Sequence, residues 1–409
     1  MSDRETRIKN FQDNAFGMFI HFGLYSLLAK GEWASKWGNI NKEEYENLIN
    51  SFGKDGFNIK ETLSAIKEAG ARYITITTRH HDGFSLYDTK GLSNFDVMHS
   101  AYQKDFLKEV VIEARKIGLI PFFYHTLIDW HLPMEINGDY SSYFSYLEKS
   151  IEILCTNYGP IGGFWFDGSW DFKEGVFNPE RIYKIIRQYQ KDALIINNTG
   201  LEALGDKGKD DVDVVTFERG KSFLLDNKDK LYGSEKCQIL ASHWGYCEQD
   251  INFKSVATTL KDILETRANN ANYLLNVGPK GDFSLREEDL AFLKALTTWN
   301  KYNPNVIYAS FKNDAPQLSS NKAYFLSIEG RDYLVIEDIP MEGDPHVVRN
   351  EITSKIRVSN LKRMPKQLSI LDNSVNISFS KINDKEIEFS LPTFPYGTDL
   401  ICRVIEFIY

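Results

Sequence analysis

Residues 162–170 read Gly-Gly-Phe-Trp-Phe-Asp-Gly-Ser-Trp, an apolar and aromatic run that contains a single carboxylate. The run predicts a short buried strand with Asp167 at its C-terminal tip, because Gly168 favours a break in the strand. A carboxylate in an apolar frame costs free energy unless it is hydrogen-bonded or has a chemical task. Asp167 is therefore the first candidate for a catalytic nucleophile, with a loop cap as the simpler alternative.

Working outward, runs of strand character alternate with helical patterns over about residues 16–300. Such alternation predicts a parallel sheet, and eight strands predict a (β/α)₈-like barrel. The expected strands are 16–22, 73–78, 120–125, 163–167, 194–198, 213–218, 238–243 and 273–277. The expected helices are 59–69, 106–117, 143–157, 179–189, 256–269 and 285–301. No strong helix is visible between the fifth and seventh strands, so we expect a gap in the helical ring there.

The pattern changes after residue 303 to short runs separated by turn residues, which predicts an antiparallel β-sandwich. The runs are 323–328, 332–336, 354–358, 367–371, 375–380, 386–391 and 400–407. We therefore expect a catalytic barrel over residues 1–303 and a C-terminal sandwich over residues 304–409.

Composition excludes several classes of partner. The net charge is −9, from 57 acidic and 48 basic residues, so we expect no nucleic acid partner. No apolar run approaches the roughly 20 residues of a membrane helix, and residues 1–14 lack an apolar signal segment. The four cysteines have no metal-type spacing and predict reduced thiols. We expect a cytoplasmic protein without membrane contact; a mature secreted form is the alternative, and the oligomeric state stays open.

In barrels of this class the reacting groups lie at the C-terminal ends of the strands. The predicted ends carry several neutral donors, several aromatic rings and at least two carboxylates, a set typical of a site for a neutral, hydroxyl-rich substrate. Glycoside hydrolysis uses two carboxyl groups about 5–5.5 Å apart for retention, or about 6.5–9.5 Å apart for inversion. Asp167 and Glu218 are compatible with either spacing. The other candidates are His21, Glu32, Trp33, His80, His81, Tyr124, Trp165 and Trp244.

Simpler explanations exist for some of these residues. Glu218 precedes Arg219 and could form a plain ion pair. His80 and His81 could be turn residues or metal ligands, although strand one has no His-x-His pattern and no helix has His-Glu-x-x-His. We therefore expect no metal and no other cofactor.

Four segments together resemble glycoside hydrolase family 29, the α-L-fucosidases, in their bacterial form. The resemblance covers roughly residues 8–300 and implies a retaining enzyme with a catalytic barrel followed by a β-sandwich. Its substrate would be a fucosylated glycan. The segments are Phe-Gly-Met-Phe-Ile-His-Phe-Gly at 16–23, His-His-Asp-Gly-Phe at 80–84, Trp-Phe-Asp at 165–167 and Asn-Tyr-Leu-Leu-Asn-Val-Gly-Pro-Lys-Gly-Asp at 272–282.

The resemblance also implies roles for individual residues. Asp167 matches the nucleophile, and the strand-end histidines His21, His80 and His81 match those that hold fucose hydroxyls. Glu32, Trp33, Tyr124 and Trp244 match further positions of the sugar site, where Trp244 would cover the fucose methyl group.

The acid/base has two candidates within the resemblance. Glu218 ends an Asp-x-x-Thr-x-Glu run at 213–218 and is preferred, while Glu235 matches a second position proposed in some members. An arginine that some members carry after strand five falls near Thr199 here, which puts one sugar contact in doubt. Two rival functions remain: a metal-dependent barrel hydrolase, and a sugar-binding protein that has lost the acid/base.

Overall fold

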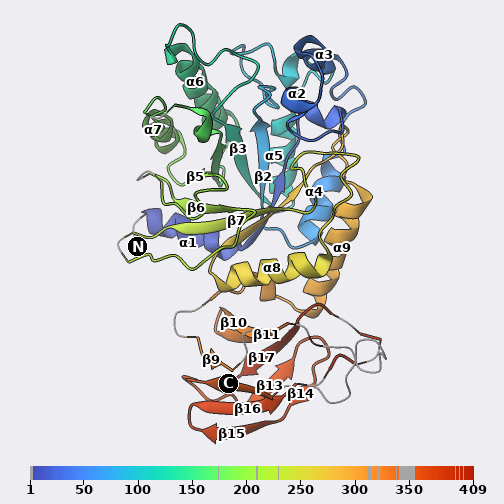
Figure 1. The fold of residues 1–409 in the computed structure, drawn as a ribbon, viewed down its shortest axis with the longest axis vertical. Coiled ribbons are helices and arrows are strands. Elements are labelled where there is room, and N and C mark those ends of the chain that lie inside the picture. The colour runs from blue at the N-terminus through green and yellow to red at the C-terminus, as the bar shows by residue number, and fades with distance from the viewer. Residues whose placement is uncertain are drawn as a thin grey trace. The chain divides into compact units, whose positions relative to one another are not determined.

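The computed structural model describes most of the chain (Figure 1). The described residues are 3–173, 175–208, 211–228, 230–311, 315–319, 323–337, 339, 355–391, 393–395, 397–398 and 400–409. The chain forms two compact units, Met1–Lys254 with Asn272–Lys294, and Ser255–Ala271 with Ala295–Tyr409. The domain limit expected near residue 303 stays a prediction.

The first unit contains a closed barrel of eight parallel strands, as the alternating pattern predicts. Strands that follow one another in the chain are neighbours in the barrel, and the last closes the ring by pairing with the first. The strands are β1 (Phe16–Ile20), β2 (Tyr73–Arg79), β3 (Ile120–Thr126), β4 (Gly163–Asp167), β5 (Leu194–Asn197), β6 (Val214–Glu218), β7 (Gly233–Ile239) and β8 (Asn272–Val277).

The prediction for the seventh strand is wrong in its limits. We expected residues 238–243, but β7 begins at Gly233 and ends at Ile239. Its first half, Ser-Glu-Lys, is too polar to suggest a buried strand, yet Glu235 finds hydrogen-bond donors inside the barrel from Tyr73 and Trp165. Trp244 consequently lies in the loop after the strand rather than at its tip.

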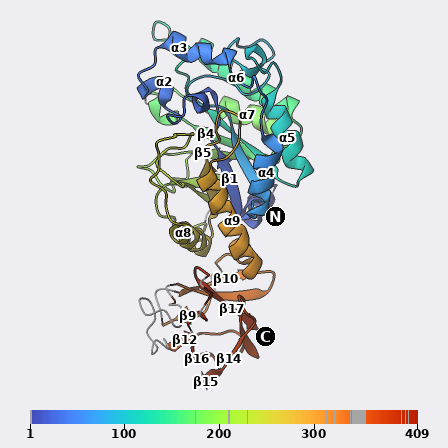
Figure 2. The same cartoon turned by 90° about the vertical axis from the view of Figure 1, so that its right-hand side faces the viewer.

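Helices α4 to α7 lie on the outside of the barrel. α6 and α7 run side by side in Figure 1, and α4 and α5 do so in Figure 2. All six predicted helices are present, and the described residues between β5 and β7 contain no helix, as expected. The α-helices are α1 (Asp3–Asn14), α2 (Ala34–Trp37), α3 (Lys42–Asn47), α4 (Ile59–Glu68), α5 (Phe106–Lys116), α6 (Ser141–Asn157), α7 (Glu180–Tyr189), α8 (Val256–Ala268) and α9 (Glu287–Tyr302). The 3₁₀ helices are η1 (Leu24–Leu27), η2 (Leu48–Asn50), η3 (Val97–His99), η4 (Ser169–Asp171) and η5 (Val306–Tyr308).

Helix α1 was not predicted, because only Ile8 and Phe11 in it are buried. These two side chains join a core cluster with residues at the starts of β2, β5 and β6, so the helix covers the N-terminal end of the barrel. Ion pairs stabilise the polar face of α1. Arg4 and Arg7 approach the buried carboxylate of Asp213 to 2.7 and 2.8 Å, and Arg187 of α7 approaches it to 2.7 Å.

The second unit contains two antiparallel sheets, in agreement with the predicted sandwich. One has the order β10-β11-β17-β13-β14 and the other β15-β16-β12-β9. The strands are β9 (Gln317–Leu318), β10 (Ala323–Ile328), β11 (Arg331–Ile336), β12 (Lys355–Ser359), β13 (Gln367–Ile370), β14 (Asn376–Ile377), β15 (Phe379–Asn383), β16 (Glu386–Ser390) and β17 (Arg403–Ile408). Strand β9 was not predicted, and the first residue of the strand expected at 354–358 lies outside the described residues.

The described helices and the cysteines bear on two further expectations, the absence of a membrane-spanning helix and the presence of reduced thiols. None of the described helices combines the length and the apolar character that a membrane crossing requires. The four cysteines all lie in the described residues, and no disulfide joins them.

Candidate active site

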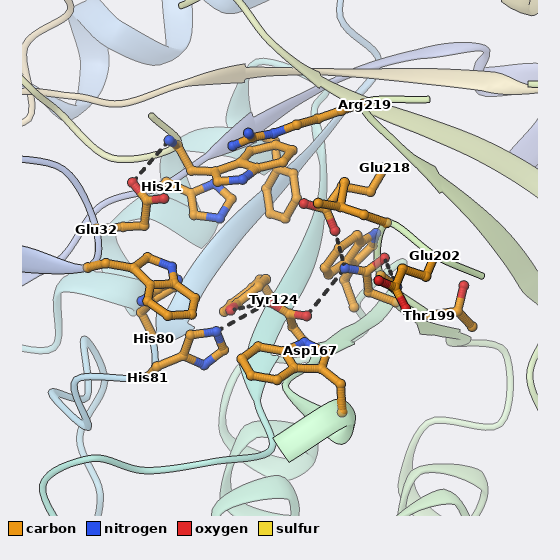
Figure 3. Close-up of a pocket in the computed structure, with 18 residues that line it drawn as sticks. His21, Glu32, His80, His81, Tyr124, Asp167, Thr199, Glu202, Glu218 and Arg219 are labelled. Carbon is orange, nitrogen blue, oxygen red and sulfur yellow. Dashed lines mark hydrogen bonds and ion pairs between the residues drawn. The ribbon is translucent and has the colours of Figure 1, made fainter. Parts of the chain in front are cut away.

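A cavity of about 490 Å³ lies at the C-terminal end of the barrel (Figure 3). Its volume is in the usual range of small-molecule sites, about 300–1,000 Å³. Of the eleven predicted site residues, ten line it, and only Glu235 does not. The lining consists of Phe19, His21, Glu32, Trp33, His80, His81, Tyr124, Trp165, Asp167, Trp170, Asn198, Thr199, Gly200, Leu201, Glu202, Glu218, Arg219 and Trp244.

Asp167 is the last residue of β4 and accepts hydrogen bonds from two neighbouring groups. The Tyr124 hydroxyl donates to its Oδ2 at 3.0 Å, and the Asn198 amide donates to its Oδ1 at 3.3 Å. Nε2 of His81 lies 3.5 Å from Oδ2. Burial acts to raise the pKa of Asp167, but His81, Tyr124 and Asn198 outweigh burial and lower this pKa to about 2. The carboxyl group is therefore ionised at neutral pH.

Asn198 connects the two carboxylates. Its Nδ2 donates to Oδ1 of Asp167 at 3.3 Å and to Oε2 of Glu218 at 2.7 Å. Since one nitrogen is this close to both, these two carboxylate oxygens are at most about 6 Å apart. The side chain of Asn198 cannot flip to exchange its oxygen and nitrogen without losing two hydrogen bonds. Its Oδ1 accepts from the Thr216 hydroxyl at 3.1 Å and from the Gly200 backbone amide at 3.3 Å.

Glu218 ends β6 and has the opposite electrostatic environment to Asp167. Burial raises the pKa of Glu218 and the charge of Asp167 raises it further, against the hydrogen bond from Asn198, which lowers it. Figure 3 shows Asp167 between the histidines on one side and Glu218 on the other. The pair thus consists of a carboxylate whose pKa is lowered and a carboxyl whose pKa is raised, the division that acid–base catalysis requires.

Arg219 lines the cavity directly after Glu218, although neighbouring residues of a strand face opposite sides. The backbone explains this arrangement, because Arg219 has a φ of 54°, a left-handed conformation uncommon for residues other than glycine. Its guanidinium lies 5.2 Å from the centre of the Trp244 ring. The turn therefore lets both charged side chains reach the same cavity.

His21 follows β1 and presents a hydrogen-bond acceptor. Nδ2 of Asn276 donates to the Trp244 carbonyl at 2.7 Å, which leaves its Oδ1 to accept from Nδ1 of His21 at 2.7 Å. Burial lowers the pKa of His21 to about 3, so the ring is neutral. With the proton on Nδ1, Nε2 can accept a hydrogen bond from a ligand hydroxyl.

His80 and His81 both line the cavity because β2 has already ended at Arg79. The His80 ring stacks on Tyr124 with centroids 5.6 Å apart, and burial lowers its pKa well below the ordinary value. Nδ1 of His81 lies 2.7 Å from the Thr126 hydroxyl.

Aromatic rings form much of the remaining wall. Trp165 packs edge-on against Phe19 at 4.9 Å and stacks on Tyr124 at 5.7 Å, while Trp33 stacks with Trp170 at 6.2 Å. Such faces suit the apolar side of a sugar ring.

Glu32 holds the loop that follows β7. Its Oε2 accepts the backbone amides of Trp244 at 3.0 Å and Gly245 at 2.9 Å. Gly245 has no room for a side chain, because a Cβ there would lie 2.9 Å from the Glu32 nitrogen. Glu32 therefore fixes the position of Trp244 as well as lining the cavity.

Glu235 lies inside the barrel and outside the cavity lining. It accepts hydrogen bonds from the Tyr73 hydroxyl at 2.6 Å and the Trp165 indole at 3.0 Å, and it is 1% exposed. Burial raises its pKa to about 7. Its contact with the cavity runs through Trp165.

Some lining residues were not predicted. Asn198 directly follows β5, and the rule that strand ends carry the reacting groups indicates this residue as well. Other lining residues lie beyond the strand ends, where the spacing of residues in the sequence does not indicate which side chains face the cavity. They are Trp170, Arg219 and residues 199–202. Among the described residues, no three His, Cys, Asp or Glu side chains converge in a way that could hold a metal ion. The expected absence of a cofactor stays a prediction.

Comparison with known proteins supports one family. The family model described as Alpha-L-fucosidase matches residues 2–305. An alpha-L-fucosidase from Dictyostelium discoideum is 23% identical over 81% of this chain and 78% of that protein. A tissue alpha-L-fucosidase from Bos taurus is 26% identical over 86% of this chain and 79% of that protein.

Solved structures share the fold over nearly the whole chain. Alpha-L-fucosidase isoenzyme 1 from Paenibacillus thiaminolyticus aligns with a TM-score of 0.82 and 26% identity, covering 100% of this chain and 99% of that one. A family 29 alpha-L-fucosidase from Bacteroides thetaiotaomicron, solved as a trapped covalent intermediate, aligns with a TM-score of 0.81 and 22% identity, covering 98% and 95%.

Proposed function

The chain belongs to the alpha-L-fucosidase family and is a glycoside hydrolase, and we propose that it removes terminal α-L-fucosyl residues from oligosaccharides or glycoconjugates with retention of configuration. One observation carries the proposal. The side-chain amide of Asn198 donates to both Asp167 and Glu218. The two oxygens that accept from it, Oδ1 of Asp167 and Oε2 of Glu218, are therefore at most about 6 Å apart. This limit favours the retaining spacing of about 5–5.5 Å over the inverting range of about 6.5–9.5 Å.

In the first step, Asp167 attacks the anomeric carbon while the bond to the leaving oxygen breaks. Glu218 transfers its proton to that oxygen, and a covalent fucosyl-enzyme forms. In the second step, Glu218 takes a proton from water, the water oxygen attacks the anomeric carbon, and Asp167 leaves. The low pKa of Asp167 and the raised pKa of Glu218 suit these roles. The intermediate trapped in the Bacteroides thetaiotaomicron relative agrees with this path.

The remaining lining residues would bind the sugar. Neutral His21 would accept a hydroxyl hydrogen at Nε2, and His80 and His81 would contact further hydroxyls. Trp33, Trp165 and Trp244 would cover apolar faces of the ring, with Tyr124 and Glu32 holding Asp167 and Trp244 in place. We assign Glu235 to positioning Trp165.

The proposal is tested with Asp167→Gly on an aryl α-L-fucoside. Turnover should fall by several orders of magnitude, and added azide should restore part of it and yield a β-fucosyl azide. Asp171→Ala is the matched control, because Asp171 is an exposed carboxylate four residues further on and should leave the rate unchanged. A variant that keeps more than about a tenth of wild-type activity would overturn the assignment.

Glu218→Ala separates the two steps. A substrate with a good phenolate leaving group should show a burst followed by a slow steady state, and azide should speed that steady state with an α-fucosyl azide as product. Glu235→Ala should show neither signature. If the signatures are exchanged between Glu218 and Glu235, so are the roles.

Two further measurements address the rival functions. A fucose-dependent rise in melting temperature without any turnover would indicate a sugar-binding protein. Loss of activity in EDTA that a divalent metal restores would indicate a metal-dependent hydrolase.

A further inference from the structure

One end of the active-site cavity is formed by residues 199–202, which follow β5, and by Glu218 and Arg219, at and directly after the end of β6. In Figure 3, Glu202 and Glu218 lie on one side of Asp167, while the histidines lie on the other. We call residues 199–202, Glu218 and Arg219 the acid end of the cavity.

The chemistry of the first step places the leaving group at this end. A general acid must come within about 2.6–3.2 Å of the oxygen that it protonates. Oε2 of Glu218 already accepts from Asn198 at 2.7 Å, which leaves Oε1 to carry the proton. While the fucosyl ring lies among the histidines, the group that leaves therefore extends into the acid end.

The chain after β5 is held in place beside the acid. The Thr199 hydroxyl donates to the Ala203 carbonyl at 2.6 Å, and the Gly200 amide donates to Oδ1 of Asn198 at 3.3 Å. Gly200 has a φ of 78°, a conformation that favours glycine. Because Asn198 also donates to Glu218, the position of residues 199–202 is fixed relative to the acid.

Leu201 gives the acid end an apolar surface. Two large apolar side chains of the cavity lining are exposed, Leu201 by 60% and Trp170 by 49%. The Trp170 ring lies 5.7 Å from His81 and therefore belongs to the end with the histidines. A single exposed leucine is common on protein surfaces, but Leu201 lies in the lining of a cavity beside the acid. It can therefore contact the apolar face of a leaving group.

Glu202 and Arg219 add opposite charges, and both side chains are exposed. Within the described residues, the Glu202 carboxylate has no hydrogen bond or ion pair, and the Arg219 guanidinium has a single hydrogen bond, to the Ser242 carbonyl at 3.4 Å. A carboxylate only accepts and a guanidinium only donates, whereas a sugar hydroxyl does both. A leaving group with hydroxyls can contact both charges, while an alkyl group would displace their water without replacing it.

We propose that Leu201, Glu202 and Arg219 form the subsite that holds the leaving sugar, and that this subsite determines which fucosides the protein prefers. Hydroxyl groups of the leaving sugar bind to Glu202 and Arg219, and the apolar face of its ring packs on Leu201. The inference rests on the proposed function, because it takes Glu218 as the acid.

The test compares two kinds of substrate. One is α-L-fucosyl fluoride, whose leaving group has no ring and no hydroxyl and cannot use the subsite. The other is a fucosyl disaccharide, chosen as the one that the wild-type protein cleaves fastest among α1,2-linked D-galactose and α1,3-, α1,4- and α1,6-linked N-acetyl-D-glucosamine. The measured quantity is kcat/KM for the disaccharide divided by kcat/KM for the fluoride.

Variants of the loop should lower this ratio. Leu201→Ala should lower it by about threefold, because apolar contact with the leaving sugar is lost. Glu202→Ala should lower it by about fivefold or more, and Glu202→Gln by less, since glutamine keeps an acceptor oxygen. Leu224→Ala is the matched control, because Leu224 is 44% exposed on the next loop and does not line the cavity, and it should leave the ratio unchanged.

A second measurement separates lost contact from a change in the acid. The alkaline limb of kcat/KM for the disaccharide should stay in place in Leu201→Ala and Glu202→Ala, because neither variant acts through the protonation of Glu218. Arg219 is less suitable for this test, since its charge also lowers the pKa of Glu218.

Four results would overturn the inference. They are an unchanged ratio in both folded loop variants, a fall that the shift of the alkaline limb fully accounts for, a fall in Trp170→Ala but in neither loop variant, and cleavage of the fluoride but of none of the disaccharides. If the wild-type protein does not cleave the fluoride, the proposed function itself fails, and this inference fails with it.

Discussion

Replacing Asn198 with alanine should move the alkaline limb of the pH–activity profile upward. The Asn198 amide donates to Glu218 at 2.7 Å and stabilises its charged form. Without this donor the pKa of Glu218 rises, so the protonated acid persists to higher pH. A hydrogen bond to a charged group contributes about 1.5–3 kcal/mol, and 1.36 kcal/mol corresponds to one pKa unit. We expect a shift of about one unit, from the lower end of that range.

The acidic limb should change less. The bond from Asn198 to Asp167 is longer, at 3.3 Å, and Tyr124 and His81 stay in place. The pKa of Asp167 starts at about 2, so a rise of less than about one unit leaves it ionised above about pH 4.

The assay is kcat/KM between about pH 4 and about pH 9 on an aryl α-L-fucoside with a poor leaving group, because such a substrate needs the acid. Thr216→Val is a matched control. It removes the hydroxyl that holds the Asn198 amide at 3.1 Å, and it should shift the alkaline limb in the same direction by less. Asn198→Asp adds a like charge and should shift it by more. An alkaline limb that stays in place or moves down in Asn198→Ala would refute the reasoning, and Asn198 would then act only in binding.

Other residues give further predictions. Burial raises the pKa of Glu235 from 4.5 to about 7, so the folded protein holds this proton more tightly than the unfolded chain. Its unfolding free energy should therefore fall as pH rises through that window, and Glu235→Gln should remove this part of the slope in urea denaturation at several pH values; equal slopes would contradict the assignment. His21→Ala should weaken L-fucose binding by about 1–3 kcal/mol in calorimetry, and unchanged affinity would remove His21 from the site. Asp213→Ala leaves Arg4, Arg7 and Arg187 without their shared carboxylate and should lower the unfolding free energy by about 3–5 kcal/mol in urea denaturation, whereas a loss near zero would show that the cluster does not hold α1.

The sequence by itself determined the barrel and most of its active-site residues. Strand and helix periods are local properties of the chain, and the rule that strand ends carry the reacting groups then places Asp167, Glu218 and His21 at one end. Resemblance of four short segments was enough to identify the family, because each segment is continuous in the chain. For the same reason the short runs after residue 303 predicted the antiparallel sheets.

Only the tertiary structure decided how these groups are paired. β7 begins at Gly233, five residues earlier than predicted, because the buried Glu235 accepts hydrogen bonds in the barrel from Tyr73 and Trp165, which are distant in the chain. Asn198 joins the two carboxylates because Thr216, on the neighbouring strand, holds its amide in one orientation. Hydrogen bonds between residues far apart in the chain leave no periodic trace in it, so the separation of the carboxylates and the direction of each pKa shift follow from the fold alone.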